Sequence, residues 1–491
     1  MDRGDEGVSL KQLMDPADKP KEACGVVGVY APGQHLSKLT YFALLALQHR
    51  GQESAGIGVS EGGAMVVYKE MGLVAQVFDE YTLNSLTGNL AIGHVRYSTT
   101  GSSRWDNAQP IYRENGGRSV ALGHNGNLVN TLELCGEMKD PGRAKGCSTD
   151  SDVIAEMIVA SKAGTTEEAI LEVLPQLKGA FTLVFMDPTT IYGARDPWGL
   201  RPLALGRLPD GYVLASESCA LDSIGATLIR EVEPGEMVAI DENGVRSTRY
   251  AEATPKLCIF EYVYFSRPDS ILYGKSVQKA RYQMGMRLAE EAPVSADLVM
   301  PVPDSGRGAA AGYSQTSGVP LVDGFVKNAY VGRTFIQPTQ SIRNQGIGAK
   351  LNPVAHVIEG KRVIVVDDSI VRGNTTRQIV RMLRNAGAKE VHLRISSPPI
   401  KWPCFYGIDT ANRDELIASS RSPEEIGAFV EADSLGYLSI EGMVAATEVE
   451  EEKFCTACFS SNYPIAVPEE LKLTKNMLED ARVAAEPGAP I

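Results

Sequence analysis

The sequence lacks a long apolar run. No stretch of its 491 residues approaches the roughly 20 apolar residues that a membrane-spanning helix needs. The first twenty residues, MDRGDEGVSLKQLMDPADKP, have neither the cationic start nor the apolar centre of a secretory signal. Acidic residues outnumber basic ones, 61 to 48, which leaves no broad basic face for a nucleic-acid backbone. We therefore expect a cytoplasmic protein without membrane or nucleic-acid partners.

Cysteine is also scarce, with eight residues in the whole chain. So few in a chain of this length do not form a disulfide framework, so each one is core filler, a ligand or a nucleophile. The composition that remains, 43% hydrophobic and 22% charged, is that of a globular protein. The length predicts two or three domains.

The residue pattern changes along the chain. Residues 1–23 are polar and predicted to be disordered. From Cys24 to about Cys258, short β-branched runs alternate with two helical patterns, which predicts a layered α+β domain. We expect one helix between Ser37 and Gly51, and another in residues 151–164 that ends at a glycine.

After about residue 290 the order becomes strand, loop, helix, strand. Residues 362–396 have the length of a βαβ unit, and Val363 to Val366 form an apolar run typical of a parallel strand buried on both faces. This pattern predicts a mostly parallel α/β sheet. The predicted boundaries are 1–23 for a leader, 24–258 and 259–467 for two domains, and 468–491 for a C-terminal helix and tail.

Four stretches of the first domain carry candidate chemistry: CGVVGVY, GHVRYSTTG, GHNGNLVN and STDSDV. Taken singly, they fit a core strand, a surface ion pair, a hairpin turn and a helix cap. Together with LQHRGQESAGIG, and in this order, they resemble the glutamine-hydrolysing domain of amidotransferases with an N-terminal nucleophile. The resemblance implies the αββα fold of such domains.

The resemblance also implies roles for individual residues. The leader would be a propeptide, and its removal after Ala23 would make Cys24 the first residue. A free α-amino group titrates near pH 7.7–8.0, so Cys24 would then supply both nucleophile and base. The Asn125 side chain and the Gly126 N–H would stabilise the oxyanion, while Arg96 and Asp150 would bind the glutamine α-carboxylate and α-amino group. A papain-like pair of Cys24 with His94 or His124 remains a mechanistic alternative.

A second motif, VVDDSIVRGNTT, lies between a buried strand and a helix in residues 365–376. Loop N–H groups, threonine hydroxyls and a helix N-terminus together suit a monophosphate, and the carboxylates suit ribose hydroxyls or Mg²⁺. An acidic strand end before a capped helix is the ordinary structural alternative. The whole string resembles the phosphoribosyl-diphosphate signature of type I phosphoribosyltransferases.

This second resemblance implies a substrate site built from several segments. Asp367 and Asp368 would contact the ribose and Mg²⁺, with Ser305 as a third magnesium-site residue. The implied contacts to the 5′-phosphate come from Arg372, Gly373, Asn374, Thr375 and Thr376. A flap that contains Lys327, Tyr330 and Arg333 would close over the diphosphate.

A glutaminase followed by a type I phosphoribosyltransferase resembles the amidophosphoribosyltransferase family. The resemblance implies that ammonia from glutamine displaces diphosphate from phosphoribosyl diphosphate, giving 5-phosphoribosylamine in the first committed step of purine synthesis. It also implies a homotetramer inhibited by purine nucleotides. Two other functions remain: a non-enzymatic nucleotide sensor, and an amidotransferase for another acceptor such as a sugar phosphate.

The late chain contains a CxxC motif, Cys455 and Cys458. By itself this spacing fits zinc, an iron–sulfur cluster or a redox pair. Some amidophosphoribosyltransferases carry a [4Fe-4S] cluster on four such cysteines, and the resemblance places Cys258 and Cys404 at the other two positions. The remaining thiols have no partner motif and are interpreted as core or surface residues: Cys135, Cys147 and Cys219.

Overall fold

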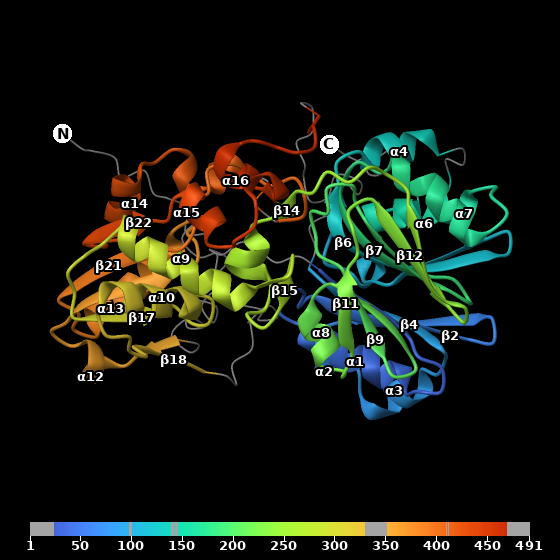
Figure 1. Cartoon of the computed structure of the whole chain (residues 1–491), viewed down its shortest axis with the longest axis horizontal. Helices are drawn as coiled ribbons and strands as arrows, with labels where there is room; N and C mark the ends of the chain where they lie inside the picture. Colours follow the sequence, from blue (N-terminus) through green and yellow to red (C-terminus); the bar gives the residue numbers. More distant parts are fainter. Residues whose placement is uncertain are drawn as a thin grey trace, which may run out of the picture.

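The computed structural model describes residues 24–97, 101–138, 142, 146–328, 351–408, 410 and 412–468. These residues form two halves that lie side by side, blue to green and yellow to red in Figure 1. The leader, the flap residues Tyr330 and Arg333 and the C-terminal tail lie outside the described residues, so the propeptide, the flap and the terminal helix stay predictions. In the described part of the chain, no helix combines the length and hydropathy that crossing a membrane requires.

The first half is built on two antiparallel sheets. Seven strands form one sheet in the order β11-β9-β10-β1-β4-β2-β3, and six form the other in the order β13-β12-β8-β7-β6-β5. The first sheet contains β1 (Gly25–Tyr30), β2 (Ser54–Glu61), β3 (Ala64–Met71), β4 (Leu90–Arg96), β9 (Ala204–Leu208), β10 (Gly211–Ala215) and β11 (Thr227–Glu231). The second contains β5 (Ile111–Asn115), β6 (Arg118–Leu128), β7 (Gly179–Met186), β8 (Ile191–Arg195), β12 (Glu236–Asp241) and β13 (Gly244–Arg249).

Helices cover the outer face of each sheet. One apolar core lies between the sheets and includes Val26, Ile92 and Val184, and a separate core lies under the helices on each side. This arrangement is the predicted αββα order of layers. The helices on the seven-stranded sheet are α1 (Leu36–Ala46), α2 (Val74–Val77), α3 (Glu80–Ser85) and α8 (Ser218–Asp222); those on the six-stranded sheet are α4 (Thr131–Glu137), α6 (Asp150–Ala160) and α7 (Thr166–Val173).

Both predicted helices of this half are present, but their ends differ from the expectation. Ser37 is no cap, because α1 already begins at Leu36 and the Ser37 hydroxyl donates to the Leu83 carbonyl at 2.6 Å. Gly51 lies beyond the end of α1, where a Cβ atom would come within 2.5 Å of the Val95 backbone. Close backbone approach therefore explains this glycine, and not a helix stop. Similarly, α6 ends at Ala160, before the expected Gly164.

The second half contains a four-stranded parallel sheet in the order β17-β20-β21-β22. Val363 and Val365 of β20 face one core, and Ile364 and Val366 face the core on the opposite side. Both faces of β20 are thus buried, as its continuous apolar run predicts. The strands are β17 (Leu298–Pro301), β20 (Arg362–Asp367), β21 (Glu390–Ile395) and β22 (Ser434–Tyr437). The helices are α9 (Val277–Glu291), α10 (Arg307–Ser317) and α15 (Ile440–Ala445) on one face, and α12 (Ala355–Ile358), α13 (Asn374–Asn385) and α14 (Pro423–Phe429) on the other.

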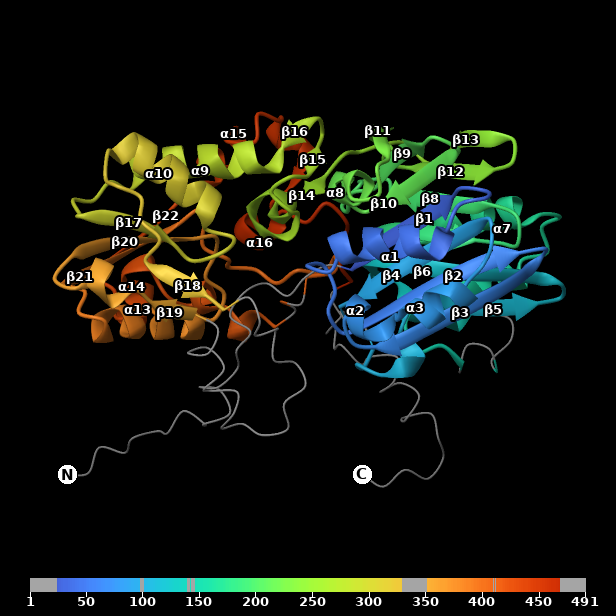
Figure 2. The same ribbon diagram turned by 90° about the horizontal axis from the view of Figure 1, so that it is seen from below.

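Short elements join the two halves and lie between them in both Figure 1 and Figure 2. The late chain returns to the first half here, because Tyr406 and Cys455 share an apolar cluster with Val129, Ala180 and Leu200. The joining elements are β14 (Leu257–Cys258), η3 (Glu261–Phe265), β15 (Ile271–Leu272), β16 (Lys275–Ser276), β23 (Phe454–Cys455) and α16 (Ala457–Ser460). A further pair, β18 (Phe325–Lys327) and β19 (Leu351–Pro353), forms a small antiparallel sheet of the second half.

Candidate functional sites

Cys24 lies directly before β1, a central strand of the seven-stranded sheet. Its Sγ donates to the Tyr97 carbonyl at 3.2 Å and accepts from the Tyr97 N–H at 3.4 Å. Burial raises the pKa of the Cys24 thiol to about 11, despite opposing effects of Tyr97 and Arg96. With the leader attached, this side chain is therefore a thiol at neutral pH and not a thiolate.

The four predicted stretches of the first half meet in one small cavity. Cys24, Arg96, Gly126 and Asp150 all line it, at the start of β1, the end of β4, the end of β6 and the start of α6. These residues are spread along the sequence from position 24 to position 150, so the two packed sheets are what bring them together. The other residues that line the cavity are Tyr97, Gln109, His124, Thr149 and Ser151.

Asn125 and Gly126 lie inside β6, paired with β7, so the hairpin-turn interpretation is wrong. Gly126 has a φ of +151°, and a Cβ atom there would come within 2.1 Å of the Ala180 carbonyl oxygen. Only glycine fits this position without a shift of the backbone. The Asn125 amide is fully buried, and neither its nitrogen nor its oxygen has a hydrogen-bond partner among the described residues. It is not among the residues that line the cavity.

Arg96 is 2% exposed, so the surface ion-pair interpretation is also wrong. Its Nη1 lies 3.4 Å from Glu53 Oε2 and 3.3 Å from the Ser102 carbonyl. This geometry holds a buried guanidinium at the cavity wall, where it can bind a carboxylate.

Asp150 is the first residue of α6, whereas the cap itself is Thr149. The Asp150 carboxylate accepts from the Leu128 N–H at 3.2 Å and the Ser151 N–H at 2.8 Å. Burial alone would raise the pKa of Asp150, but His124 and these N–H groups outweigh it and hold the pKa below its usual value. Asp150 is thus a buried anion that can bind an ammonium group.

The two histidines are poorly placed to act as a base for Cys24. His94 is fully buried, its Nε2 lies 3.0 Å from the His124 carbonyl, and burial lowers the pKa of His94 to about 3. His124 lines the cavity, but its Nδ1 lies 3.3 Å from the Ser151 hydroxyl. Within the described residues, the hydrogen bonds of Cys24 go to Tyr97 alone.

The second site lies at the carboxyl end of the parallel sheet. Asp367 ends β20, and Ser305 follows the neighbouring strand β17, so the topology places them at the same sheet edge. The Ser305 hydroxyl donates to Asp368, which also accepts from the Ser369 hydroxyl at 2.6 Å. The Asp368 N–H donates to Asp367 Oδ1 at 2.9 Å. The three residues of the predicted magnesium site are therefore adjacent.

The loop that follows these carboxylates leads into α13. Gly373 caps the helix with a φ of +81°, and a Cβ atom there would come within 2.8 Å of Ile417. Asn374, Thr375 and Thr376 form the first turn of α13, and the N-terminus of a helix is a common place for a phosphate to bind.

Two cations border this site. The Arg372 guanidinium forms an ion pair with Glu415, and Lys327 at the end of β18 forms one with Asp304. The structure therefore gathers every described member of the predicted phosphoribosyl set around one sheet edge.

Cys258, Cys404, Cys455 and Cys458 line a second small cavity, between the two halves. Cys258 in β14 lies opposite Cys455 in β23, and burial raises the pKa of Cys258 to about 12. Of the other thiols, Cys147 and Cys219 are buried in the core and Cys135 is half-buried, so none of the three is a free surface thiol.

The spacing of these four thiols bears on what they can hold. A tetrahedral zinc ion with bonds of about 2.3 Å requires sulfur atoms roughly 3.8 Å apart. Across the chain outside its undescribed gaps, no three His, Cys, Asp or Glu side chains converge closely enough to hold a single metal ion. Within the described residues, the four thiols thus share a cavity without forming a site for a single metal ion.

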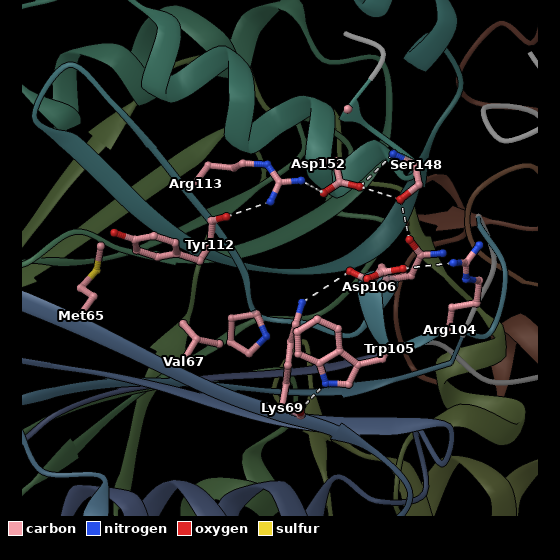
Figure 3. Close-up of a pocket in the computed structure, with 13 residues that line it drawn as sticks. Met65, Val67, Lys69, Arg104, Trp105, Asp106, Tyr112, Arg113, Ser148 and Asp152 are labelled. Carbon is pink, nitrogen blue, oxygen red and sulfur yellow. Dashed lines mark hydrogen bonds and ion pairs between the residues drawn. The ribbon is translucent and has the colours of Figure 1, made fainter. Parts of the chain in front are cut away.

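A further cavity, of about 910 Å³, is shown in Figure 3. Its charged side chains pair with each other, Arg113 with Asp152 at 2.6 Å and Arg104 with Asp106 at 3.3 Å. Burial lowers the pKa of Lys69 in its wall to about 8. None of the residues proposed from the sequence lines this cavity.

Sequence reasoning missed several residues of the two smaller cavities. Gln109 and Ser151 line the first, where the Gln109 amide donates to the Ser151 hydroxyl at 3.0 Å. Arg201 lines the cysteine cavity and contacts Glu261. Ser151 lies within the quoted stretch STDSDV but was given no role, whereas Gln109 and Arg201 lie outside the quoted motifs. Only an arginine within the otherwise apolar stretch LRPLALG could have indicated one of them.

Comparison with known proteins defines the class of each half. Residues 94–223 match the model of the glutamine amidotransferase domain, and residues 277–396 match that of the phosphoribosyl transferase domain. The molecule is thus a glutamine amidotransferase joined to a phosphoribosyltransferase.

Whole-chain comparisons give the family. Amidophosphoribosyltransferase of Mycobacterium tuberculosis is 56% identical over 99% of this chain and 94% of its own. The Bacillus subtilis enzyme is 47% identical over 92% of this chain and 96% of its own. A solved structure of the Bacillus subtilis glutamine phosphoribosylpyrophosphate amidotransferase, complexed with ADP and GMP, has a TM-score of 0.85 at 46% identity, covering 91% of this chain and 98% of that one.

The chain belongs to the amidophosphoribosyltransferase family. Its function is the glutamine-dependent amination of phosphoribosyl diphosphate in purine biosynthesis. The fold class and the function predicted from the sequence are both confirmed.

Proposed function

We propose that residues 1–23 are a propeptide and that Cys24, once exposed as the first residue, is the nucleophile. The Cys24 proton passes to its own α-amino group, and Sγ attacks the side-chain amide carbon of glutamine. The α-ammonium group returns a proton to the leaving nitrogen, so ammonia departs and a γ-glutamyl thioester remains. Water then hydrolyses the thioester to glutamate and restores the thiol.

The observation that carries this mechanism is the shared cavity of Cys24, Arg96, Gly126 and Asp150. Burial holds the pKa of Cys24 near 11, so the thiol needs a base in direct reach. The hydrogen bonds of Cys24 among the described residues reach no histidine. An α-amino group on Cys24 itself supplies that base.

Arg96, Gly126 and Asp150 line the same cavity, which supports their glutamine contacts, and Asn125 precedes Gly126 in β6. We assign the oxyanion to the Gly126 N–H and the unpaired Asn125 amide, because a buried amide without a partner is costly unless a ligand uses it. One such donor is typically worth about 3 kcal/mol in the transition state. Arg96 would bind the α-carboxylate and Asp150 the α-amino group.

At the second site, ammonia would attack the anomeric carbon of phosphoribosyl diphosphate as diphosphate leaves, giving 5-phosphoribosylamine. Asp367 would orient the ribose hydroxyls, and residues 372–376 the 5′-phosphate. Ser305, Asp367 and Asp368 present oxygen ligands that suit Mg²⁺, which would neutralise charge on the leaving diphosphate. Lys327, Tyr330 and Arg333 would close over the diphosphate and exclude water.

Cys258, Cys404, Cys455 and Cys458 would hold a [4Fe-4S] cluster. The cavity that all four cysteines line supports this assignment. Bound there, the cluster would cross-link segments about 200 residues apart, where closing a loop restricts the unfolded chain most. Neither half-reaction transfers electrons, so its role would be structural or oxygen-sensing.

One relative bears on regulation. Because the Bacillus subtilis structure was solved with ADP and GMP, we expect purine nucleotides to inhibit this enzyme. We also expect the protein to be a homotetramer and to be cytoplasmic. Light scattering of the purified protein tests the oligomeric state.

One assay tests the central reaction. Purified protein is given glutamine, phosphoribosyl diphosphate and Mg²⁺, and glutamate and diphosphate are followed together. Equal amounts of both products are expected. Glutamate without diphosphate would favour an amidotransferase for another acceptor, and neither product, with nucleotide binding intact, would favour a sensor.

A further inference from the structure

One buried cation borders the cysteine cavity. Arg201 is 1% exposed and lines the cavity together with all four cysteines. An arginine guanidinium stays protonated in proteins, so a buried cation lies in the wall of the cavity that the four cysteines share.

One donor atom of Arg201, its Nε, has no hydrogen-bond partner among the described residues. Its Nη1 lies 3.3 Å from Glu261 Oε1, and its Nη2 donates to the Tyr406 carbonyl at 3.1 Å. Its Nε–H is buried and has no partner among the described residues. A buried N–H group on a charged side chain is costly to leave unpaired, so this donor needs an acceptor that the described residues do not supply.

Arg201 does not have a carboxylate partner to itself. Its carboxylate partner, Glu261, is shared with Arg50, which makes a closer contact with the other Glu261 oxygen. Arg50 in turn pairs with Glu217. Two guanidinium groups thus face two carboxylates, and the contact of Arg201 with Glu261, at 3.3 Å, is longer than the closest contact of Arg50 with the same carboxylate.

We propose that Arg201 is a positioning residue of the cysteine site: its guanidinium is the buried counter-charge of the anionic cluster, and its Nε–H is a hydrogen-bond donor to the thiolate shell. The proposal rests on the iron–sulfur assignment made above. Four thiolates around a [4Fe-4S]²⁺ core carry a net charge of two minus, which becomes three minus on one-electron reduction. A cation in the low-dielectric cavity wall stabilises the reduced state more, so it raises the reduction potential.

The test compares substitutions that separate charge from geometry. Arg201→Met removes the charge, and Arg201→Lys keeps it but loses the planar fork. Arg413→Met is the matched control, because Arg413 is an exposed cation that lies over Trp402, two residues before Cys404, at 3.9 Å. Solvent screens its charge, whereas Arg201 is buried.

Each protein is reconstituted anaerobically with iron and sulfide and titrated with dithionite while the cluster spectrum is followed. Iron content and thermal unfolding are measured in parallel. We expect Arg201→Met to shift the equilibrium of the one-electron couple at least tenfold towards the oxidised form, a fall of 59 mV or more. Arg201→Lys should shift it less, and Arg413→Met should leave it unchanged.

Two results would overturn the proposal: a potential in Arg201→Met equal to that of the unsubstituted protein, or an equal shift in Arg413→Met. If Arg201→Met binds no iron, the reduction potential of Arg201→Lys is compared with that of the unsubstituted protein instead, because that variant retains the charge. If the unsubstituted protein binds about four iron atoms but its reduction potential does not change when Arg201 is replaced, the role of Arg201 is refuted and the cluster assignment stands. An unsubstituted protein that takes up no iron refutes the cluster itself.

Discussion

Cys258 and Cys455 lie opposite each other in the parallel pairing of β14 with β23. One strand leaves the first half of the molecule, and the other belongs to the late chain that returns to it. This pairing places the CxxC motif beside a cysteine far away in sequence, and Cys404 completes the same cavity. The contact between the halves therefore depends on the segments that carry these cysteines.

Replacing one of these cysteines should remove the metal. We expect Cys455→Ser to lose most of its iron and to unfold at a lower temperature, because a cluster cannot be held with its normal ligand set and its cross-link is lost. Cys135→Ser, at a half-buried thiol of α4, is the matched control and should keep about four iron atoms per chain. Full iron content in Cys455→Ser would exclude that residue as a ligand.

Removal of the leader should activate Cys24. At a pKa near 11, only about one thiol in 3,000 is ionised at pH 7.5, so a chain that retains the leader should react slowly with iodoacetamide at this position. A chain that begins at Cys24 should react much faster and hydrolyse glutamine. Intact-mass analysis identifies each form. Full glutaminase activity with the leader attached would revive the pairing of Cys24 with a histidine.

The two sites should fail independently. Cys24→Ala should abolish glutamine-dependent synthesis and leave synthesis from high ammonia largely intact, because the sugar site lies in the other half. Asp367→Asn should impair both routes by at least tenfold. Product formation is measured with each nitrogen source. Loss of the ammonia-dependent route in a folded Cys24→Ala protein would contradict this division of labour.

Gly126 should tolerate no side chain. A Cβ atom would come within 2.1 Å of the Ala180 carbonyl at a φ of +151°, so Gly126→Ala must shift the strand that offers the oxyanion donor. We expect glutaminase activity to fall at least a hundredfold. Gly123→Ala in the same strand is the control, because its Cβ atom would meet Val26 at 3.4 Å, an ordinary contact. A fully active Gly126→Ala enzyme would remove Gly126 from the site.

His94 should make the first half sensitive to acid. Its pKa in the folded protein is near 3, below its unfolded value of about 6.5, so the stabilisation is present above pH 6.5 and is lost as the pH falls towards 3. Between pH 7.5 and 5.5 this histidine should cost about 1.4 kcal/mol of unfolding free energy. His94→Gln should lose correspondingly less over that range, whereas the exposed His356→Gln should behave like the unsubstituted protein. Denaturant midpoints at both pH values provide the measurement.

The sequence by itself determined the class of each half and most candidate residues. Local patterns suffice for this: β-branched runs with glycines predict strands, and the buried run Val363 to Val366 predicts a parallel strand with its ligands at the carboxyl end. The motifs around Cys24 and Asp367 carry their own chemistry, so they can be recognised without knowing how the chain folds.

Only the tertiary structure decided which interpretation of each motif holds. Asn125 and Gly126 lie within a strand and Arg96 is buried because sheet pairing and burial depend on residues far away in sequence. For the same reason, Arg201 and Glu261, whose contact joins the two halves, could not be identified from the sequence. A buried ion pair leaves no local pattern, since each partner is chosen by packing and not by its neighbours in the chain.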